Sequence, residues 1–234
     1  MRLPLPSALG LAAVALIALP LAAGAQVTTV DEGSFTVTRG GAAVGREEFR
    51  ILRQPAGAGT EFVARALAAY GDRRIAPALQ ADPGGLPLRY QVEVREGRAV
   101  THRLTGQLAR GHFATQAQSG SSESARTYLL GDTTVVVDDE LFHQYYFLAL
   151  HRRGGGEAGV PMLVPRRNVH GAARVREDGP ERLTVGARVL DATRLVVTDP
   201  LGRARIVWID GGGRVLRVAS PAEGLVAQRD DPPR

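Results

Sequence analysis

The sequence predicts a mainly β protein in which an antiparallel meander of strands encloses one apolar helix. Short runs of alternating apolar and polar residues recur along the chain, and Gly, Pro or Asp separates most of them. Such runs, joined by turn residues and not by helical stretches, are typical of antiparallel sheets. One stretch differs, since residues 140–151 contain neither Gly nor Pro and carry four aromatic side chains. A chain of 234 residues is long enough for one domain with a buried core.

The first 25 residues have the features of a secretory signal peptide. Arg2 provides a positive start, Leu9–Leu21 is almost entirely apolar, and Ala23-Gly24-Ala25 forms a cleavage site of small residues. The apolar stretch is shorter than the roughly 20 residues that span a bilayer. We therefore expect a periplasmic or secreted mature protein without a transmembrane segment. The chain has no cysteine, which excludes disulfides, a thiol nucleophile and a cysteine-linked lipid anchor.

The mature chain is predicted to form one β-rich domain, residues 26–228, followed by a polar C-terminal tail, residues 229–234. All 29 Lys and Arg residues are Arg, against 24 acidic residues, and the formal net charge is +5. Because the two signs are interspersed, with no block of basic residues, nucleic acid is not an expected partner.

An opening hairpin is the first element expected after the signal peptide. The segments 34–38 and 43–51 alternate in polarity on either side of Gly40-Gly41, as two antiparallel strands joined by a turn do. Their buried side is predicted to carry Phe35, Val37, Phe49 and Ile51. Further strands are expected at residues 61–69, 88–96, 99–105 and 111–118, and the Ser-rich residues 118–126 are expected to form a loop.

A change of pattern after residue 137 predicts the helix. The strand-like stretch 128–137 leads into Asp138-Asp139, whose side chains suit a helix N-terminus, and the helix is expected to end at His151 before basic residues and glycines. Beyond it, residues 159–165 contain Pro161 and Pro165 and are expected to be an edge strand or an extended connection. The remaining strands are expected at residues 172–176, 181–189, 192–198, 204–209 and 215–219, the last two joined by a turn at 210–213.

Clustered aromatic residues distinguish the predicted helix. Phe142, Tyr145, Tyr146 and Phe147 fall within six residues, so the helix is apolar on most sides and should be enclosed by the sheet. A curved sheet around such a helix can leave an apolar cavity. These four residues, with Trp208 from the closing hairpin, are the candidates for lining a ligand pocket. The alternative is that the helix fills the concave side of the sheet completely.

No motif indicates catalysis or a bound cofactor. The five histidines lack the spacing of a metal site. Residues 120–124 lack the final glycine of a nucleophile elbow, and the glycine runs lack the context of a phosphate loop. We expect no catalytic residue, metal or cofactor. One alternative stays open, a hydrolase in which Asp138, Asp139 and Glu140 converge in a cleft as acid and base.

The order of the elements resembles that of secreted bacterial proteins of unknown function. The resemblance rests on the signal peptide, the hairpin from Gly33 to Phe49, the aromatic helix, and the stretch Val207–Val218 with its Trp208-Ile209-Asp210. In those families an unclosed antiparallel β-barrel wraps a helical element, and the architecture is similar to that of the lipoprotein carriers of the Lol system. The resemblance implies an incompletely closed barrel around the helix and a place in the cell envelope, whereas a fold alone does not carry a function.

Together these observations predict an exported, non-enzymatic protein that binds a lipid-like or other hydrophobic ligand. An envelope assembly or scaffold protein is the first alternative, with a protein partner bound at a sheet edge such as Val160–Val164. The hydrolase is the second.

Overall fold

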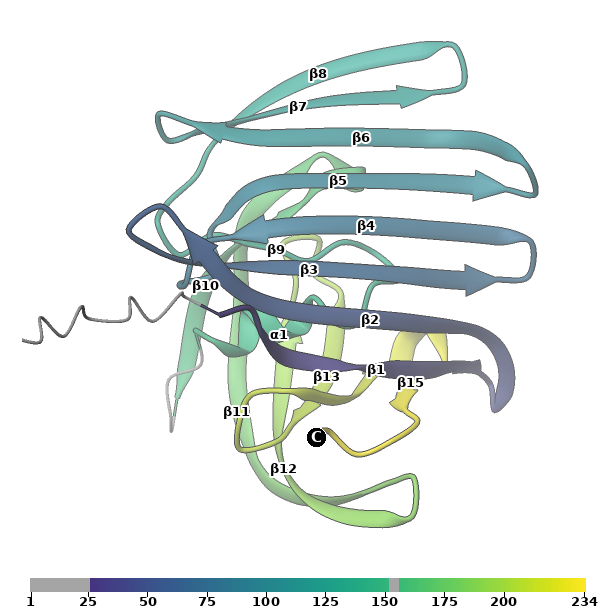
Figure 1. Cartoon of the computed structure of the whole chain (residues 1–234). Coiled ribbons are helices and arrows are strands. Elements are labelled where there is room, and N and C mark those ends of the chain that lie inside the picture. Colours follow the sequence, from purple (N-terminus) through teal and green to yellow (C-terminus); the bar gives the residue numbers. More distant parts are fainter. Residues whose placement is uncertain (1–25, 152–155) are drawn as a thin grey trace, which may run out of the picture.

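The computed structural model describes residues 26–151 and 156–234, so the predicted signal peptide lies outside the described residues. Fifteen strands form one continuous sheet (Figure 1). Their bounds are β1 (Thr28–Arg39), β2 (Ala42–Ala56), β3 (Gly59–Tyr70), β4 (Arg73–Ala81), β5 (Pro87–Glu96), β6 (Ala99–Ala109), β7 (His112–Ser119), β8 (Ser122–Leu129), β9 (Val135–Val136), β10 (Glu157–Val164), β11 (Val169–Val185), β12 (Arg188–Thr198), β13 (Ala204–Ile209), β14 (Val215–Ser220) and β15 (Leu225–Arg229). The helical elements are α1 (Tyr145–Ala149), η1 (Pro165–Arg167) and η2 (Pro221–Glu223).

The sheet consists of two meanders joined through the ends of the chain. Strands β1 to β8 follow one another in the sheet, as do β9 to β15, and β1 pairs with β15. Neighbouring strands are antiparallel except β9 and β10. Both free edges, β8 and β9, therefore come from the middle of the chain, and they do not pair within the described residues. The predicted fold class, an unclosed and mainly antiparallel barrel around one helix, is confirmed.

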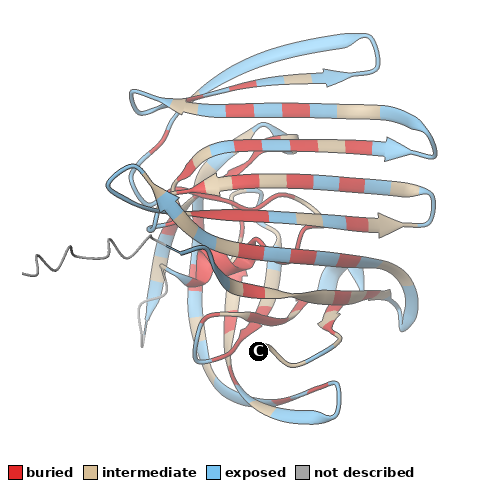
Figure 2. Ribbon diagram, in the orientation of Figure 1, coloured by how far each residue is buried: buried red, intermediate tan, exposed pale blue. Residues whose placement is uncertain are grey.

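The inner face of the sheet carries the main hydrophobic core. Phe35, Val37, Phe49 and Ile51 are each at most 6% exposed, which confirms the predicted buried side of the hairpin. Burial alternates along β2 to β7 (Figure 2), because successive side chains of a strand point to opposite faces. Helix α1 lies against this inner face, and its residues belong to the same core. Within the described residues, no helix has the length and hydropathy needed to cross a membrane.

The helix is much shorter than the sequence suggests. It begins at Tyr145, its N-cap is Gln144, and no side chain caps it. The prediction that Asp138 and Asp139 cap the helix is wrong, because both carboxylates bind arginines instead. Glu140 adopts a left-handed conformation with φ of 64°, which no helix tolerates, so the chain turns before the helix begins.

Three strands were not expected. The predicted loop 118–126 contains most of β8, whose residues are nearly all polar but pair in register with β7. Strand β4 is rich in Ala and contains Pro77, and β15 is short, so both lack the alternating large apolar residues that mark a strand. Arg229, expected in the polar tail, is the last residue of β15 and is 1% exposed.

One type of turn recurs in three places. In each copy an Asp carboxylate accepts one or two backbone N–H groups at 2.9 Å, and the backbone N–H of the Asp donates to the carbonyl four residues later at 3.0 Å. The fourth residue is a glycine with φ between 78° and 90°, a conformation that glycine adopts without strain. The turns span residues 82–86, 199–203 and 210–214. The second copy positions Arg203, whose guanidinium binds Asp139.

Candidate functional site

The chain between β8 and β10 crosses the inner side of the sheet. It includes β9, the acidic residues 138–140 and helix α1, and most of its side chains from Thr134 to Ala149 are buried. All the site residues predicted from the sequence, except Trp208 and the segment Val160–Val164, lie on this crossing segment. Its attachment to the sheet therefore decides what the interior can bind.

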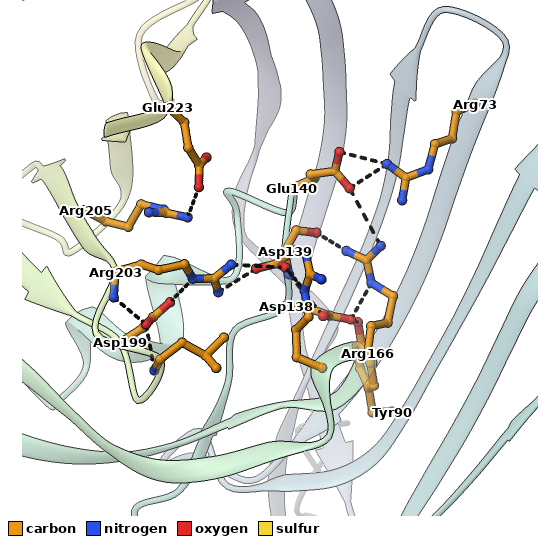
Figure 3. A network of polar contacts seen from close by, with 12 residues as sticks. Arg73, Tyr90, Asp138, Asp139, Glu140, Arg166, Asp199, Arg203, Arg205 and Glu223 are labelled. Carbon is orange, nitrogen blue, oxygen red and sulfur yellow. Dashed lines mark hydrogen bonds and ion pairs between the residues drawn. The ribbon is translucent and has the colours of Figure 1, made fainter. Parts of the chain in front are cut away.

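An ionic latch fixes the start of the crossing segment. The latch comprises Asp138, Asp139 and Glu140 and the arginines that bind them. Figure 3 shows Arg73, Arg166 and Arg203, and Arg167 is the fourth. Its most buried carboxylate is that of Asp138, which accepts hydrogen bonds from the Tyr90 hydroxyl at 2.9 Å and from Arg166 Nε at 2.8 Å. Burial, together with the charge of Asp138, raises the pKa of Tyr90, so the hydroxyl remains a donor.

The other two carboxylates of the latch bind cations from distant strands. Arg203 Nη2 donates to Asp139 at 2.8 Å, Arg167 Nε donates to it at 2.5 Å, and Arg73 Nη1 lies 2.7 Å from Glu140 Oε2. Burial acts to raise the pKa of Asp139, but the hydrogen bonds from Arg203 and Arg167 outweigh it and hold this pKa below its ordinary value. Asp139 is consequently ionised and paired at neutral pH.

The latch gives the acidic residues a positioning role. Each of Asp138, Asp139 and Glu140 has a guanidinium partner. These partners come from the start of β4, from η1 and from the turn between β12 and β13, so the latch ties the crossing segment to both meanders. A general acid or base needs a carboxylate free to exchange a proton with a substrate. The arrangement therefore gives no support to the hydrolase alternative.

A second polar pair anchors the segment just before the helix. The side chains of Glu47 and His143 are 0% and 1% exposed, and Glu47 contacts His143 Nδ1 and accepts the N–H of Phe142 at 2.7 Å. His143 Nε2 is buried and has no hydrogen-bond partner among the described residues. Glu47 was not among the predicted site residues, although it shares the alternation of Phe49 and Ile51 and so faces the core.

The four aromatic side chains near the helix are packed into the core. Phe142, Tyr145, Tyr146 and Phe147 are at most 8% exposed. Tyr146 and Phe147 each meet Phe62 edge to face, with ring centroids 5.9 and 5.8 Å apart. The cavity that reaches Phe142 and Tyr145 has a volume of about 40 Å³, close to the volume of one water molecule. The structure brings these four residues together in the core, and the cavity beside Phe142 and Tyr145 is small.

Trp208 lies apart from the other four predicted residues. Its neighbours on β13, Val207 and Ile209, belong to the main core, whereas Trp208 belongs to a second cluster on the opposite face. Its indole N–H donates to Glu181 at 2.8 Å, and the guanidinium of Arg217 lies 5.1 Å from its ring centroid. Trp208 therefore does not share a pocket with the aromatic residues of the helix.

The free edges of the sheet are β8 and the two-residue, buried β9, and not Val160–Val164. Those residues belong to β10, which pairs with β11 along its length and with β9 at Met162 and Leu163. Within residues 26–151 and 156–234, strand β8 pairs only with β7, and all its residues except Tyr128 are exposed. It appears as a nearly continuous exposed strand at the top of the view in Figure 2.

These observations describe an unclosed β-barrel with the aromatic helix packed in its core and an exposed edge strand at β8. No family model matches the chain, and no curated protein matches it. Among solved structures, the chain is similar to a β-barrel-like protein of the domain of unknown function DUF1849 from Brucella abortus. The TM-score is 0.47 and the identity 9%, over 86% of this chain and 95% of that chain. At this identity the likeness concerns the arrangement of strands and not the site.

Proposed function

We propose that the protein is exported to the periplasm and binds, without catalysis, an extended segment of an envelope protein along the free edge of β8. The observation that carries this proposal is the unpaired outer edge of an eight-residue strand. Alternate backbone N–H and C=O groups of an edge strand point away from the sheet and can pair with an added strand.

The composition of β8 disfavours non-specific pairing of its free edge with other strands. Its residues Ser122 to Thr127 are small or polar and include Glu123 and Arg126, and charged residues on an edge limit aggregation. Leu129, at the end of the strand, is 69% exposed and offers an apolar contact beside the polar ladder. An extended partner segment with one apolar residue near this end would match the edge.

Photocrosslinking in the native host tests this proposal. A benzophenone amino acid at Ala125 of β8 is expected to give a defined protein adduct, identified by mass spectrometry. The same probe at Ala76, an exposed position on the interior strand β4, is the matched control and is expected to give none.

Two proline substitutions test whether the adduct depends on strand addition. Neighbouring residues of an edge strand alternate between an inward and an outward N–H, so one of Ala125→Pro and Arg126→Pro removes a bond to β7 and the other removes only an outward donor. The first should lower Tm, and the second should leave Tm nearly unchanged. With the probe placed at Thr127, the well-folded variant is expected to lose the adduct. Undiminished crosslinking by that variant would show that β8 does not bind by strand addition.

A hydrophobic ligand is the second candidate function, and one observation favours it. Among the described residues, no side-chain hydrogen bond ties α1 to the sheet, so its five apolar or aromatic residues are held by packing. A lipid-like molecule could take the place of α1 if the helix moved outward, with Phe142, Tyr145, Tyr146 and Phe147 as its contacts. A lipid-like molecule needs this displacement to enter, since the cavity beside Phe142 and Tyr145 is only about 40 Å³.

A disulfide between α1 and the sheet tests the displacement. A Cβ built on Gly213 lies 3.8 Å from the Ala149 Cβ, a separation that suits a disulfide. Cysteine at position 213 must adopt a φ of 79°, which strains the turn, and the reduced form of the variant carries the same strain. Native mass spectrometry of undelipidated wild-type protein is expected to show an acyl-containing species. The oxidised Ala149→Cys and Gly213→Cys double variant should lack this species, and the reduced variant serves as the control. An equal amount of ligand in the oxidised and reduced forms would contradict the proposal.

A further inference from the structure

The outer face of β3 to β7 holds a hollow of about 660 Å³ that none of the predicted sites includes. Two cross-strand rows of side chains form it. One row runs from Arg65 through Gln91 to Gln116, and the other runs from Val63 through Arg89 to Ala114. The rows cross five strands, which is roughly 19 Å at the usual strand spacing.

Small residues make the hollow, and polar residues border it. Ala78 and Ala114 lie within the two rows and leave the floor low, while Gln80, Gln91, Gln107, Gln116 and Thr105 surround it. Amide and hydroxyl groups both donate and accept hydrogen bonds. Among the described residues, no acidic side chain lines the hollow, and its one aromatic residue, Tyr90, is buried on the inner side of β5. The hollow therefore has no exposed aromatic face on which bases could stack.

The two arginines of the hollow differ from their neighbours on the same face. Arg50 pairs with Glu32 at 2.8 Å, and Arg103 pairs with Glu93 at 2.7 Å. Arg65 and Arg89 have no carboxylate within salt-bridge distance among the described residues. Arg65 also stands directly opposite Arg50, a like-charge pair across two strands that costs stability. An anionic ligand would relieve that repulsion.

From this surface we infer that the hollow binds an anionic oligosaccharide. Arg65 and Arg89 bind its acidic groups, since a guanidinium matches the geometry of carboxylates, sulfates and phosphates. The glutamines and Thr105 bind its hydroxyl groups, which need both donors and acceptors. The open, shallow shape admits an extended polymer. This site lies on the outer face of β3 to β7 and does not include the edge strand β8, so it is independent of the function proposed above.

Isothermal titration calorimetry with defined oligosaccharides tests the inference. The anionic probes are tetragalacturonate, a heparin tetrasaccharide and a phosphorylated mannose tetrasaccharide; maltotetraose and inorganic phosphate are the neutral and the small-anion controls. At least one anionic probe is expected to bind at millimolar concentration or below, more weakly in high salt. The Arg65→Gln and Arg89→Gln double variant should weaken binding at least tenfold. Ala78→Glu should abolish it by filling the hollow and neutralising Arg65.

A matched control separates the site from general attraction to a basic protein. Arg182→Gln and Arg98→Gln remove the same charge from exposed positions elsewhere, and this double variant should keep its affinity. Equal losses in both double variants would overturn the inference, as would binding of maltotetraose with the affinity of the anionic probes. So would failure of all three anionic probes to bind, or full displacement of a bound probe by equimolar phosphate.

Discussion

Replacing Arg229 by methionine is expected to lower the free energy of unfolding by about 3–5 kcal/mol, the usual cost of removing one partner of a buried ion pair. The Arg229 and Asp31 side chains are 1% and 2% exposed. The guanidinium donates to both carboxylate oxygens, at 2.8 and 3.0 Å, and to the carbonyl of Glu32 at 2.6 Å. Methionine would leave the Asp31 carboxylate buried without a cation.

Urea denaturation at two pH values checks this result. Burial raises the pKa of Asp31 above its ordinary value of 3.8 even with Arg229 present, and losing the cation raises it further. A raised pKa in the folded state means that stability falls as pH rises through it, so the difference between variant and wild type should be larger at pH 7 than near pH 4.

A second variant shows whether the lone charge causes the loss. The Asp31→Leu and Arg229→Met double variant should recover most of the stability, because apolar residues often replace a buried ion pair at little cost. Arg182→Met, at an exposed position, is the control and should change the free energy of unfolding by less than about 0.5 kcal/mol. A double variant as unstable as Arg229→Met would show that packing, and not charge pairing, makes Arg229 important.

Replacing Glu47 by alanine is expected to cost about 3 kcal/mol or more, because each buried polar group left without a partner costs about 1–3 kcal/mol. The substitution would leave both the N–H of Phe142 and the ring of His143 without their shared acceptor. It would also leave a cavity at the point where the crossing segment meets β2. Thermal and urea unfolding measure the loss.

The neighbouring glutamate provides a control for this substitution. Glu48 has a side chain that is 67% exposed, and Glu48→Ala should change stability by less than about 0.5 kcal/mol. Glu47→Gln should fall between the two, since an amide oxygen can still accept the N–H of Phe142. If Glu47→Ala and Glu48→Ala proved equally stable, the buried pair would not anchor the crossing segment.

Alternation of apolar residues predicted the inner face of the barrel well. The hairpin of Phe35 and Phe49 and the burial of the aromatic helix follow from local patterns, because a strand or helix must bury one face. The extent of the helix could not be predicted in this way, since Asp138 and Asp139 form ion pairs with arginines that are distant in the sequence and do not cap the helix. Strand β8 was also missed, because pairing with β7 and not its own composition makes it a strand.

The predicted ligand site shows the same division between local and long-range information. Four of its five residues lie together, because they are close in the sequence. Trp208 was predicted from its place in the closing hairpin. The face of the sheet to which its side chain points depends on how β13 pairs with its neighbours, which the local sequence does not reveal. The arginines of the outer hollow carry no local signal, since only the pairing of β3, β4 and β5 brings them near each other.

The junction of β1 with β15 determines when the protein can finish folding. Asp31 and Arg229 are 198 positions apart, yet they meet in the middle of the sheet. A growing chain can pair β1 to β8 before the second meander is made, but β1 lacks one of its two neighbours until β15 is available. Contacts between residues so distant in sequence slow folding. The two meanders can therefore join into one sheet only after β15, the last strand, is available, so the residues of this strand complete the barrel.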